Sequence, residues 1–178
     1  MLIHAGAGGV GHIAVQLARL YGCYVITTAG RPESLQFCRD VLKVDEVIDY
    51  RRDDFVVRVK ELTGGTGVPV VFDTVGGDTF KRSIDCLSPC GQLVTITGSD
   101  PGTAALNLLY KSLTVHYEFM GARVAYDQQP ERQGEILQGI TQLVDSELLK
   151  VHVSREWTLE TLVQAHHEIE QGHTIGKM

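Results

Sequence analysis

Six residues near the start of the chain, Gly6-Ala7-Gly8-Gly9-Val10-Gly11, constrain its fold more strongly than any other segment. They follow an apolar run at residues 2–5, which is typical of a short buried strand. They open residues 10–21, where apolar side chains recur every three or four positions, as in an amphipathic helix. The glycines match the spacing G-x-G-x-x-G in the strand-to-helix context that this motif requires. The segment therefore predicts a strand–turn–helix unit.

The motif glycines have separate physical roles. Gly6 permits a tight turn, Gly8 leaves room for a pyrophosphate, and Gly11 lets the helix pack close to the strand. Free amides and the dipole at the helix N-terminus favour an anion there. We therefore expect a dinucleotide-binding loop formed by Gly6, Gly8, Gly9, Val10 and Gly11. The alternative is a glycine-rich turn without a ligand, whereas a P-loop is excluded because no Gly-Lys-Ser/Thr follows.

The chain continues as an alternation of strand and helix patterns. Further strands are predicted at 24–28, 46–48, 68–72, 92–97 and 113–119, and helices at 33–42, 55–62, 79–87 and 106–111. The apolar run 68–72 predicts a fully buried strand, and Asp53 or Asp54 and Asp78 are the expected helix caps. This alternation predicts an α/β fold, a doubly wound (Rossmann) parallel sheet in three αβα layers.

The pattern changes after Gly121. A long helix is predicted at 130–149, a short strand at 151–153 and a last helix at 158–171. We therefore expect a dinucleotide-binding core at 1–124 and a C-terminal part at 125–178. Both ends fall abruptly inside or beside strand patterns, which predicts a piece of a longer protein.

The end of the second predicted strand bears on the choice of nucleotide. An NAD site usually places a carboxylate about twenty residues after the glycines. Here the stretch is Thr28-Ala29-Gly30-Arg31, and a guanidinium fork suits a phosphate. This favours NADP over NAD, with Arg31 and Ser34 near the 2′-phosphate. Glu33 is the counter-argument, because its carboxylate has the length to reach a ribose.

Composition narrows the function classes. Lys and Arg number 16 against 22 Asp and Glu, so the chain lacks the basic surface of a general nucleic-acid binder. Its sequence has neither an apolar run long enough for a membrane span nor a signal peptide at Met1. The four cysteines have no zinc-finger or Cys-x-x-Cys spacing, which indicates reduced thiols and a cytoplasmic protein.

Several motifs together resemble the medium-chain dehydrogenase/reductase superfamily. They are His4–Gly11, Asp49-Tyr50-Arg51, Thr63-Gly64-Gly65, Phe72–Gly77, Gly98 and Gly172–Lys177. The chain is most similar to the quinone oxidoreductase branch, which includes zinc-type alcohol dehydrogenase-like proteins, and then to the enoyl reductases. The resemblance covers nearly the whole sequence and implies its nucleotide-binding domain.

The resemblance also implies residue roles. Tyr50 would lie at the adenosine end, Val75 and Gly76 along the cofactor, and Gly98 near the nicotinamide ribose. Arg51 or Arg31 would face the 2′-phosphate of NADP. Members of the branch often carry Lys where Ser34 stands, and this departure weakens the NADP assignment unless Arg31 compensates.

The activity implied is hydride transfer from NADPH to a quinone or enone-type small molecule. Relatives carry an N-terminal substrate domain with most of the catalytic pocket, so we expect no catalytic residue and no metal ligand here, and a chain inactive alone. The alternating apolar strand 113–119 would form the sheet edge, which favours pairing with a second copy, and the resemblance implies a homodimer through it. The alternative is an edge covered by the long helix that follows. Two alternatives remain open: an enoyl reductase domain of a fatty-acid or polyketide synthase, and a non-catalytic NADPH-sensing or scaffold module.

Two polar groups have competing interpretations. His166, His167, Glu168 and His173 suggest a metal site, but adjacent helical side chains point about 100° apart and favour a surface helix. Asp73, at a strand end, fits either a general acid or base or, as we prefer, a structural or ribose-side role.

Overall fold

A computed structural model describes residues 1–100, 102, 105–172 and 174–178. Within them, a parallel sheet has the strand order β3-β2-β1-β4-β5-β6. The strands are β1 (Leu2–Ile3), β2 (Ile26–Ala29), β3 (Glu46–Asp49), β4 (Val68–Asp73), β5 (Leu87–Thr95) and β6 (Thr114–Tyr117). The order reverses between β1 and β4, which is the crevice where doubly wound sheets bind ligands.

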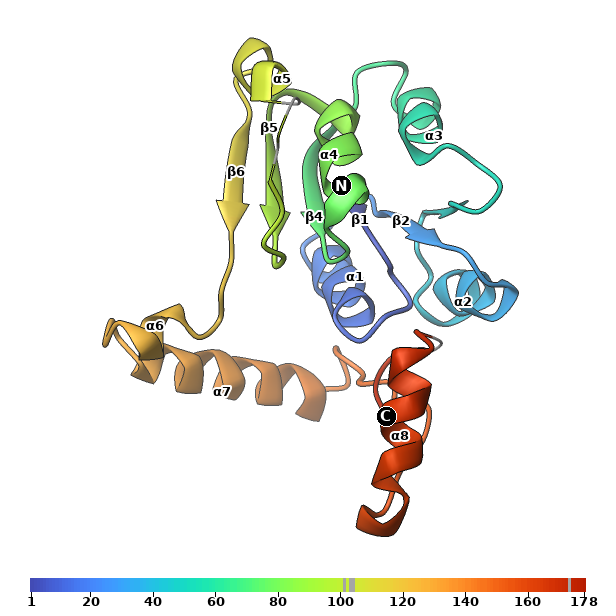
Figure 1. Cartoon of the computed structure of the whole chain (residues 1–178), viewed down its shortest axis with the longest axis vertical. Helices are drawn as coiled ribbons and strands as arrows, with labels where there is room; N and C mark the ends of the chain where they lie inside the picture. The colour runs from blue at the N-terminus through green and yellow to red at the C-terminus, as the bar shows by residue number, and fades with distance from the viewer. Residues whose placement is uncertain (101, 103–104, 173) are drawn as a thin grey trace.

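Helices connect these strands (Figure 1). They are α1 (Gly11–Leu20), α2 (Pro32–Gln36), the π-helical turn η1 (Phe37–Val41), α3 (Phe55–Leu62), α4 (Gly77–Cys86) and α5 (Ala105–Tyr110). After β6 come α6 (Ala122–Ala125), α7 (Glu131–Asp145), the 3₁₀ turn η3 (Leu159–Thr161) and α8 (Leu162–Glu170). No helix in the described ranges is long and apolar enough to cross a membrane.

Two apolar clusters cover the two faces of the sheet. The neighbours Leu2 and Ile3 are both fully buried but belong to different clusters, because successive strand residues point to opposite faces. Leu2 packs in the cluster that contains Phe80 and Ile84 of α4, and Ile3 packs with Val15 of α1. These layers confirm the predicted three-layer Rossmann fold.

The helix caps correct part of the sequence prediction. Asp54 caps α3, because its carboxylate accepts the N–H groups of Val56 and Val57. Asp78 is not a cap, since α4 begins one residue earlier, at Gly77, and Gly76 precedes it with φ of +79°. The prediction that strand 68–72 is fully buried is also wrong, because Pro69 is exposed in β4.

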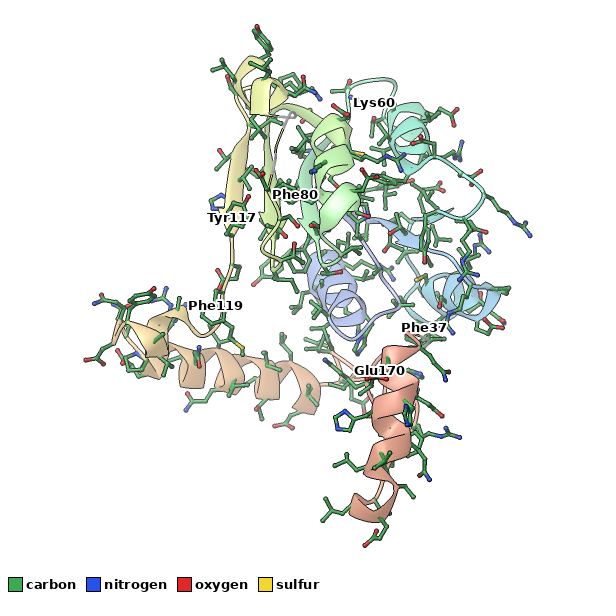
Figure 2. All side chains as sticks on the ribbon, in the orientation of Figure 1. Phe37, Lys60, Phe80, Tyr117, Phe119 and Glu170 are labelled. Atoms are coloured by element: carbon green, nitrogen blue, oxygen red, sulfur yellow. The ribbon has the colours of Figure 1, made fainter. Side chains whose placement is uncertain are left out.

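A helical arm, which we define as residues 119–149, leads from β6 into the C-terminal part. Its main helix α7 has no buried residue and ends four residues before the predicted 149, and Phe119 lies where β6 passes into the arm (Figure 2). The predicted strand 151–153 is reduced to one bridge between Val153 and Lys177. The arm and α8 lie toward the carboxyl end of the sheet, beyond the Gly6–Gly11 turn (Figure 1).

Candidate functional site

The glycine-rich turn at residues 6–11 lies directly after β1, at the carboxyl edge of the sheet. A side chain at Gly6 would place Cβ 2.2 Å from Oγ1 of Thr27, and one at Gly11 would lie 2.1 Å from the carbonyl oxygen of Ala5. Both positions therefore require glycine for packing between β1, β2 and α1. This agrees with the close strand–helix approach expected at Gly11.

Gly8 and Gly9 have different surroundings. A Cβ at Gly8 would meet only the Ala5 carbonyl oxygen, at 3.2 Å. A Cβ at Gly9 would lie 2.9 Å from the Nζ of Lys177, so the C-terminal ammonium group stands beside the turn. Among the described residues, the N–H groups of Gly9 and Val10 have no hydrogen-bond acceptor. Free amides and an adjacent cation form an arrangement suited to a phosphate group.

Hydrogen bonds attach the C-terminal tail and residue His152 to the glycine-rich turn and to α1. The Gly176 N–H donates to the Ala7 carbonyl at 2.8 Å. His12 Nδ1 is 2.9 Å from the Gly8 carbonyl, and its Nε2 accepts the His152 N–H at 3.3 Å. A carbonyl can only accept, so His12 is the neutral Nδ1–H tautomer, and burial lowers its pKa.

Sequence reasoning missed Lys177 as a site residue. The motif Gly176-Lys177 was visible in the sequence, but its distance along the chain from the glycine turn gave no sign of contact. The available signals were the positive charge of Lys177, which suits an anion site, and the place of Gly172–Lys177 among the motifs of the resemblance.

Asp73 fixes the second loop of the crevice. This buried carboxylate accepts the N–H groups of Val75 and Gly76 at 3.0 Å each and the Oγ1–H of Thr95 at 3.1 Å. With these partners it has a structural role, as preferred from the sequence. The residues that it holds, Val75 and Gly76, are two of the predicted cofactor contacts.

Glycine is also required at Gly76. Its φ is +79°, and a Cβ there would lie 2.7 Å from Oγ1 of Thr97. Thr97 continues a chain of hydroxyl groups to Ser99, whose Oγ accepts the Gly77 N–H at 3.0 Å. Gly98 lies in this segment with no atom within 4 Å of a Cβ, so its surroundings are open.

A cavity of about 260 Å³ lies between the ends of β1, β2 and β3 and the start of α4. Tyr50 and Val75 line it, and each is about half exposed, at 53% and 52%. Two residues expected to contact the cofactor from separate loops thus share one hollow. Its apolar surface and partial enclosure suit a flat aromatic group.

His4 forms the buried side of this cavity. The Ser83 hydroxyl donates to the Thr79 carbonyl, so it accepts the Nε2–H of His4 at 2.8 Å. Thr28 Oγ1 accepts the Ala5 N–H and donates to His4 Nδ1 at 3.2 Å. Every polar atom of the ring is satisfied in the neutral form, and burial lowers its pKa to about 4.

The remaining predicted residues lie around Gly30, at the end of β2. The Tyr50 ring covers Gly30, where a Cβ would be 2.5 Å from the ring. Arg51 lines a second groove beside Gly30, whereas Arg31 is not among the residues that line it. Ser34 is buried in α2, at 7% exposure. The structure thus brings Arg51 into a groove and leaves Arg31 and Ser34 outside it.

The sequence profile described as zinc-binding dehydrogenase matches residues 42–178. The chain belongs to this dehydrogenase family. Its expected place in the medium-chain dehydrogenase/reductase superfamily is thereby confirmed.

Relatives of this dehydrogenase domain are longer proteins. Quinone oxidoreductase 1 of Escherichia coli is 36% identical over 98% of this chain, which covers 54% of that protein. The crystal structure of E. coli quinone oxidoreductase complexed with NADPH has a TM-score of 0.85 at 36% identity, covering 98% of this chain and 54% of that one. A lovastatin diketide synthase of Aspergillus terreus is 32% identical over this whole chain and 7% of its own length. The chain therefore spans about half the length of the quinone oxidoreductases.

The family name raises the question of zinc. In the described part of this dehydrogenase domain, no three His, Cys, Asp or Glu side chains are grouped to hold a metal ion. Cys38 and Cys86 are buried, and burial raises the pKa of each thiol to about 12, away from the thiolate that binds zinc. Glu168 pairs with Arg155, and His173 lies outside the described residues. The described side chains do not fit a zinc site.

Proposed function

We propose that this chain is the NADPH-binding domain of a quinone oxidoreductase-like enzyme. One observation carries the proposal: Gly8 and Gly9 leave an open turn with free amides at the start of α1, and the Lys177 ammonium group stands beside it. Such a turn binds a diphosphate through backbone N–H groups, and the cation adds a charge-assisted contact.

The proposed cofactor contacts follow the crevice. The diphosphate lies at Gly6, Gly8, Gly9, Val10 and Gly11, the adenosine between Tyr50 and Val75, and the nicotinamide ribose toward Gly76 and Gly98. The shared cavity of Tyr50 and Val75 supports the adenosine placement. Lys177 joins the set as a diphosphate contact. The core 1–124 thus carries most of the site, and the part 125–178 contributes this one cation.

The chemistry that bound NADPH supplies is hydride transfer from nicotinamide C4 to a conjugated carbon of a quinone or enone. The residues of this chain bind and orient, since no described side chain at the crevice is placed as a proton donor. The substrate domain of the longer relatives would complete the pocket and exclude water. Buried free thiols at Cys38 and Cys86 fit a reducing cytoplasmic setting.

A second candidate function is an enoyl reductase domain of a polyketide synthase. The match to a diketide synthase over this whole chain favours it. The same cofactor site would serve both functions, because only the hydride acceptor differs. A non-catalytic NADPH sensor is the third possibility. It would bind NADPH at the same site as the two reductases but would transfer no hydride.

Two measurements separate these functions. Nicotinamide fluorescence of the chain titrated with NADPH and with NADH tests binding, and we expect NADPH to bind at least tenfold more tightly, because each charge-assisted contact to its 2′-phosphate contributes about that factor. Binding of neither nucleotide would refute both reductases and the sensor, and would favour a non-catalytic scaffold module. Oxidation of NADPH is then followed with a quinone and with an enoyl thioester, using a polypeptide that carries the upstream substrate domain. If NADPH binds but neither the quinone nor the enoyl thioester is reduced, the non-catalytic sensor is the remaining function.

We also propose a homodimer through β6. This strand is the outer edge of the sheet, and the Glu118 N–H bonds inward to Thr95, so the N–H of Val115 points outward by alternation. An open edge with apolar neighbours pairs readily with a second copy.

Val115→Pro tests the dimer, because proline removes the outward N–H, although it also replaces a side chain that packs against the core. Light scattering after size exclusion should give a dimer for the unchanged chain and a monomer for the variant, and circular dichroism should show that the variant remains folded. A variant that stays dimeric would place the interface elsewhere.

A further inference from the structure

A second groove, of about 390 Å³, lies beside the proposed adenosine site. It runs between α2 with its π-helical turn η1 and the turn that follows β3. Its lining includes Gly30, Leu35, Arg39, Asp49, Arg51 and Arg52. We call it the arginine groove. It touches Gly30, where β2 ends, and this is the position at which a Rossmann fold meets the adenosine ribose.

The charges of the arginine groove are not balanced. Its one carboxylate, Asp49, accepts the backbone N–H of Arg51 at 3.0 Å and lies 3.6 Å from Nε of Arg52. The side chains of Arg39 and Arg51 have no carboxylate partner among the described residues. Two unpaired guanidinium groups on one concave surface are suited to an anion with two negative charges.

The π-helical turn places Arg39 in the groove. The Leu42 N–H bonds to the Phe37 carbonyl, five residues back, so the turn from 37 to 41 is wider than an α-helical one. Phe37 and Cys38 are buried in the core, while Arg39 is exposed and faces the turn after β3. Turns of this kind occur often at functional sites.

We propose that Arg39 and Arg51 together bind the 2′-phosphate of NADPH, and that Arg39 takes the role that the sequence suggested for Arg31. The inference rests on the proposed function, because it requires the adenosine to lie between Tyr50 and Val75. It adds a specificity residue, Arg39, from the π-helical turn η1.

The test uses the whole chain and two matched probe pairs. Calorimetry measures NADPH against NADH, and adenosine 2′,5′-bisphosphate against 5′-AMP, which differ only by the 2′-phosphate. Arg39→Gln should weaken NADPH and the bisphosphate about tenfold, the value of one lost charge-assisted contact, and leave NADH and 5′-AMP unchanged. Arg132→Gln on α7, remote from the groove, is the control for a surface arginine and should change none of the four.

The outcomes separate this inference from the proposed function. Equal weakening of both members of a pair by Arg39→Gln, or no weakening, overturns the role of Arg39. A selective loss with Arg31→Gln instead would return the 2′-phosphate to Arg31 and leave NADPH binding intact. Tight binding of the bisphosphate without binding of NADPH would support the arginine groove and refute the NADPH-binding domain. Binding of neither the bisphosphate nor NADPH would refute both proposals.

Discussion

Gly6 and Gly8 are both glycines of the motif, but the structure surrounds them differently. A Cβ at Gly6 would overlap the Thr27 hydroxyl at 2.2 Å, so glycine is needed there for the fold. A Cβ at Gly8 meets one carbonyl oxygen at 3.2 Å, so glycine is needed there mainly for the proposed ligand. The two positions let stability and binding be tested separately.

Gly6→Ala should lower the free energy of unfolding by roughly 1–3 kcal/mol, because the buried overlap must be relieved by backbone shifts. Gly8→Val should retain most stability and lose NADPH binding, because the side chain occupies the diphosphate position. Thermal unfolding measures the stability of the two variants, and NADPH titration measures their affinity. A Gly8→Val protein that binds NADPH normally would contradict the loop assignment.

His4 makes the stability of the domain depend on pH. Its pKa is about 4 in the fold against 6.5 for the free side chain, so the unfolded chain binds more protons between these values. The stabilisation is present above pH 6.5 and is lost as the pH falls toward 4. The shift corresponds to roughly 3 kcal/mol.

Urea unfolding between pH 7 and 4 tests this expectation. His4→Gln should flatten the pH dependence by roughly that amount, although the neutral variant itself is less stable at pH 7. His12, whose pKa burial also lowers, contributes in the same direction and remains in the variant. His166→Gln on the exposed face of α8 is the control. Equal slopes for His4→Gln and the unchanged chain would contradict the buried neutral histidine.

Among the elements, α4 is held at both ends by side chains from elsewhere. Asp73 fixes the loop before it, and Lys111 donates to the carbonyls of Ile84, Asp85 and Leu87 at 3.1–3.3 Å. These carbonyls lie at or just after the last turn of α4, where helical partners run out. Phe80 of the same helix packs on Tyr117 of β6, with ring centroids 6.1 Å apart (Figure 2).

Lys111→Met should therefore destabilise the domain by about 1–2 kcal/mol, the net value of charged hydrogen bonds that are partly exposed. Lys81→Met, an exposed lysine on α4, is the matched control and should change stability little. Denaturant midpoints measure both. Similar midpoints for the two variants would show that Lys111 does not cap the helix.

Sequence patterns predicted most elements for physical reasons. Apolar and β-branched runs located the inner strands, which are covered on both faces, and period-two spacing located the edge strand β6. Period-3.6 spacing located the helices α1 and α3, because each buries one face. The π-helical turn η1 was missed and was predicted as part of the helix at 33–42. A segment of five residues is too short for its apolar spacing to distinguish a π-helical turn from an α-helical one. The cap predicted at Asp78 was wrong because α4 begins one residue earlier, at Gly77, directly after the loop whose N–H groups bond to Asp73.

The site was less predictable than the fold. The sequence located the glycine turn because its residues are contiguous, and Tyr50 and Val75 through the resemblance. It could not place Lys177 at Gly9, or Arg39 and Arg51 in the same groove, because both arrangements join separate segments. Such contacts depend on the tertiary arrangement, which local spacing does not encode.

At the scale of the whole molecule, α1 connects the sheet to the C-terminal part. The Gln16 amide donates to the Lys150 carbonyl and accepts the Lys150 N–H, each at 2.9 Å. One turn earlier, His12 accepts the His152 N–H. The His152 ring packs on Phe37, with centroids 4.6 Å apart, so this segment reaches both α1 and η1.

Gln16→Ala should release residues 150–154 and the tail without unfolding the core. Hydrogen exchange should quicken at Lys150, whose N–H bonds to Gln16 Oε1, and at Ser154, whose N–H bonds to the Lys177 carbonyl. The amides of α4 should keep their protection. Gln171→Ala at the end of α8 is the control. Unchanged exchange at 150–154 would mean that the side chain of Gln16 does not hold the segment.

The most direct test of the central claim is an NMR titration of the ¹⁵N-labelled chain with NADPH. If backbone amides of the glycine turn bind the diphosphate, the signals of Gly8, Gly9 and Val10 should shift the most, together with that of Lys177. Gly8→Val should abolish these shifts. Saturable binding that leaves the four signals in place and moves residues elsewhere would contradict the account.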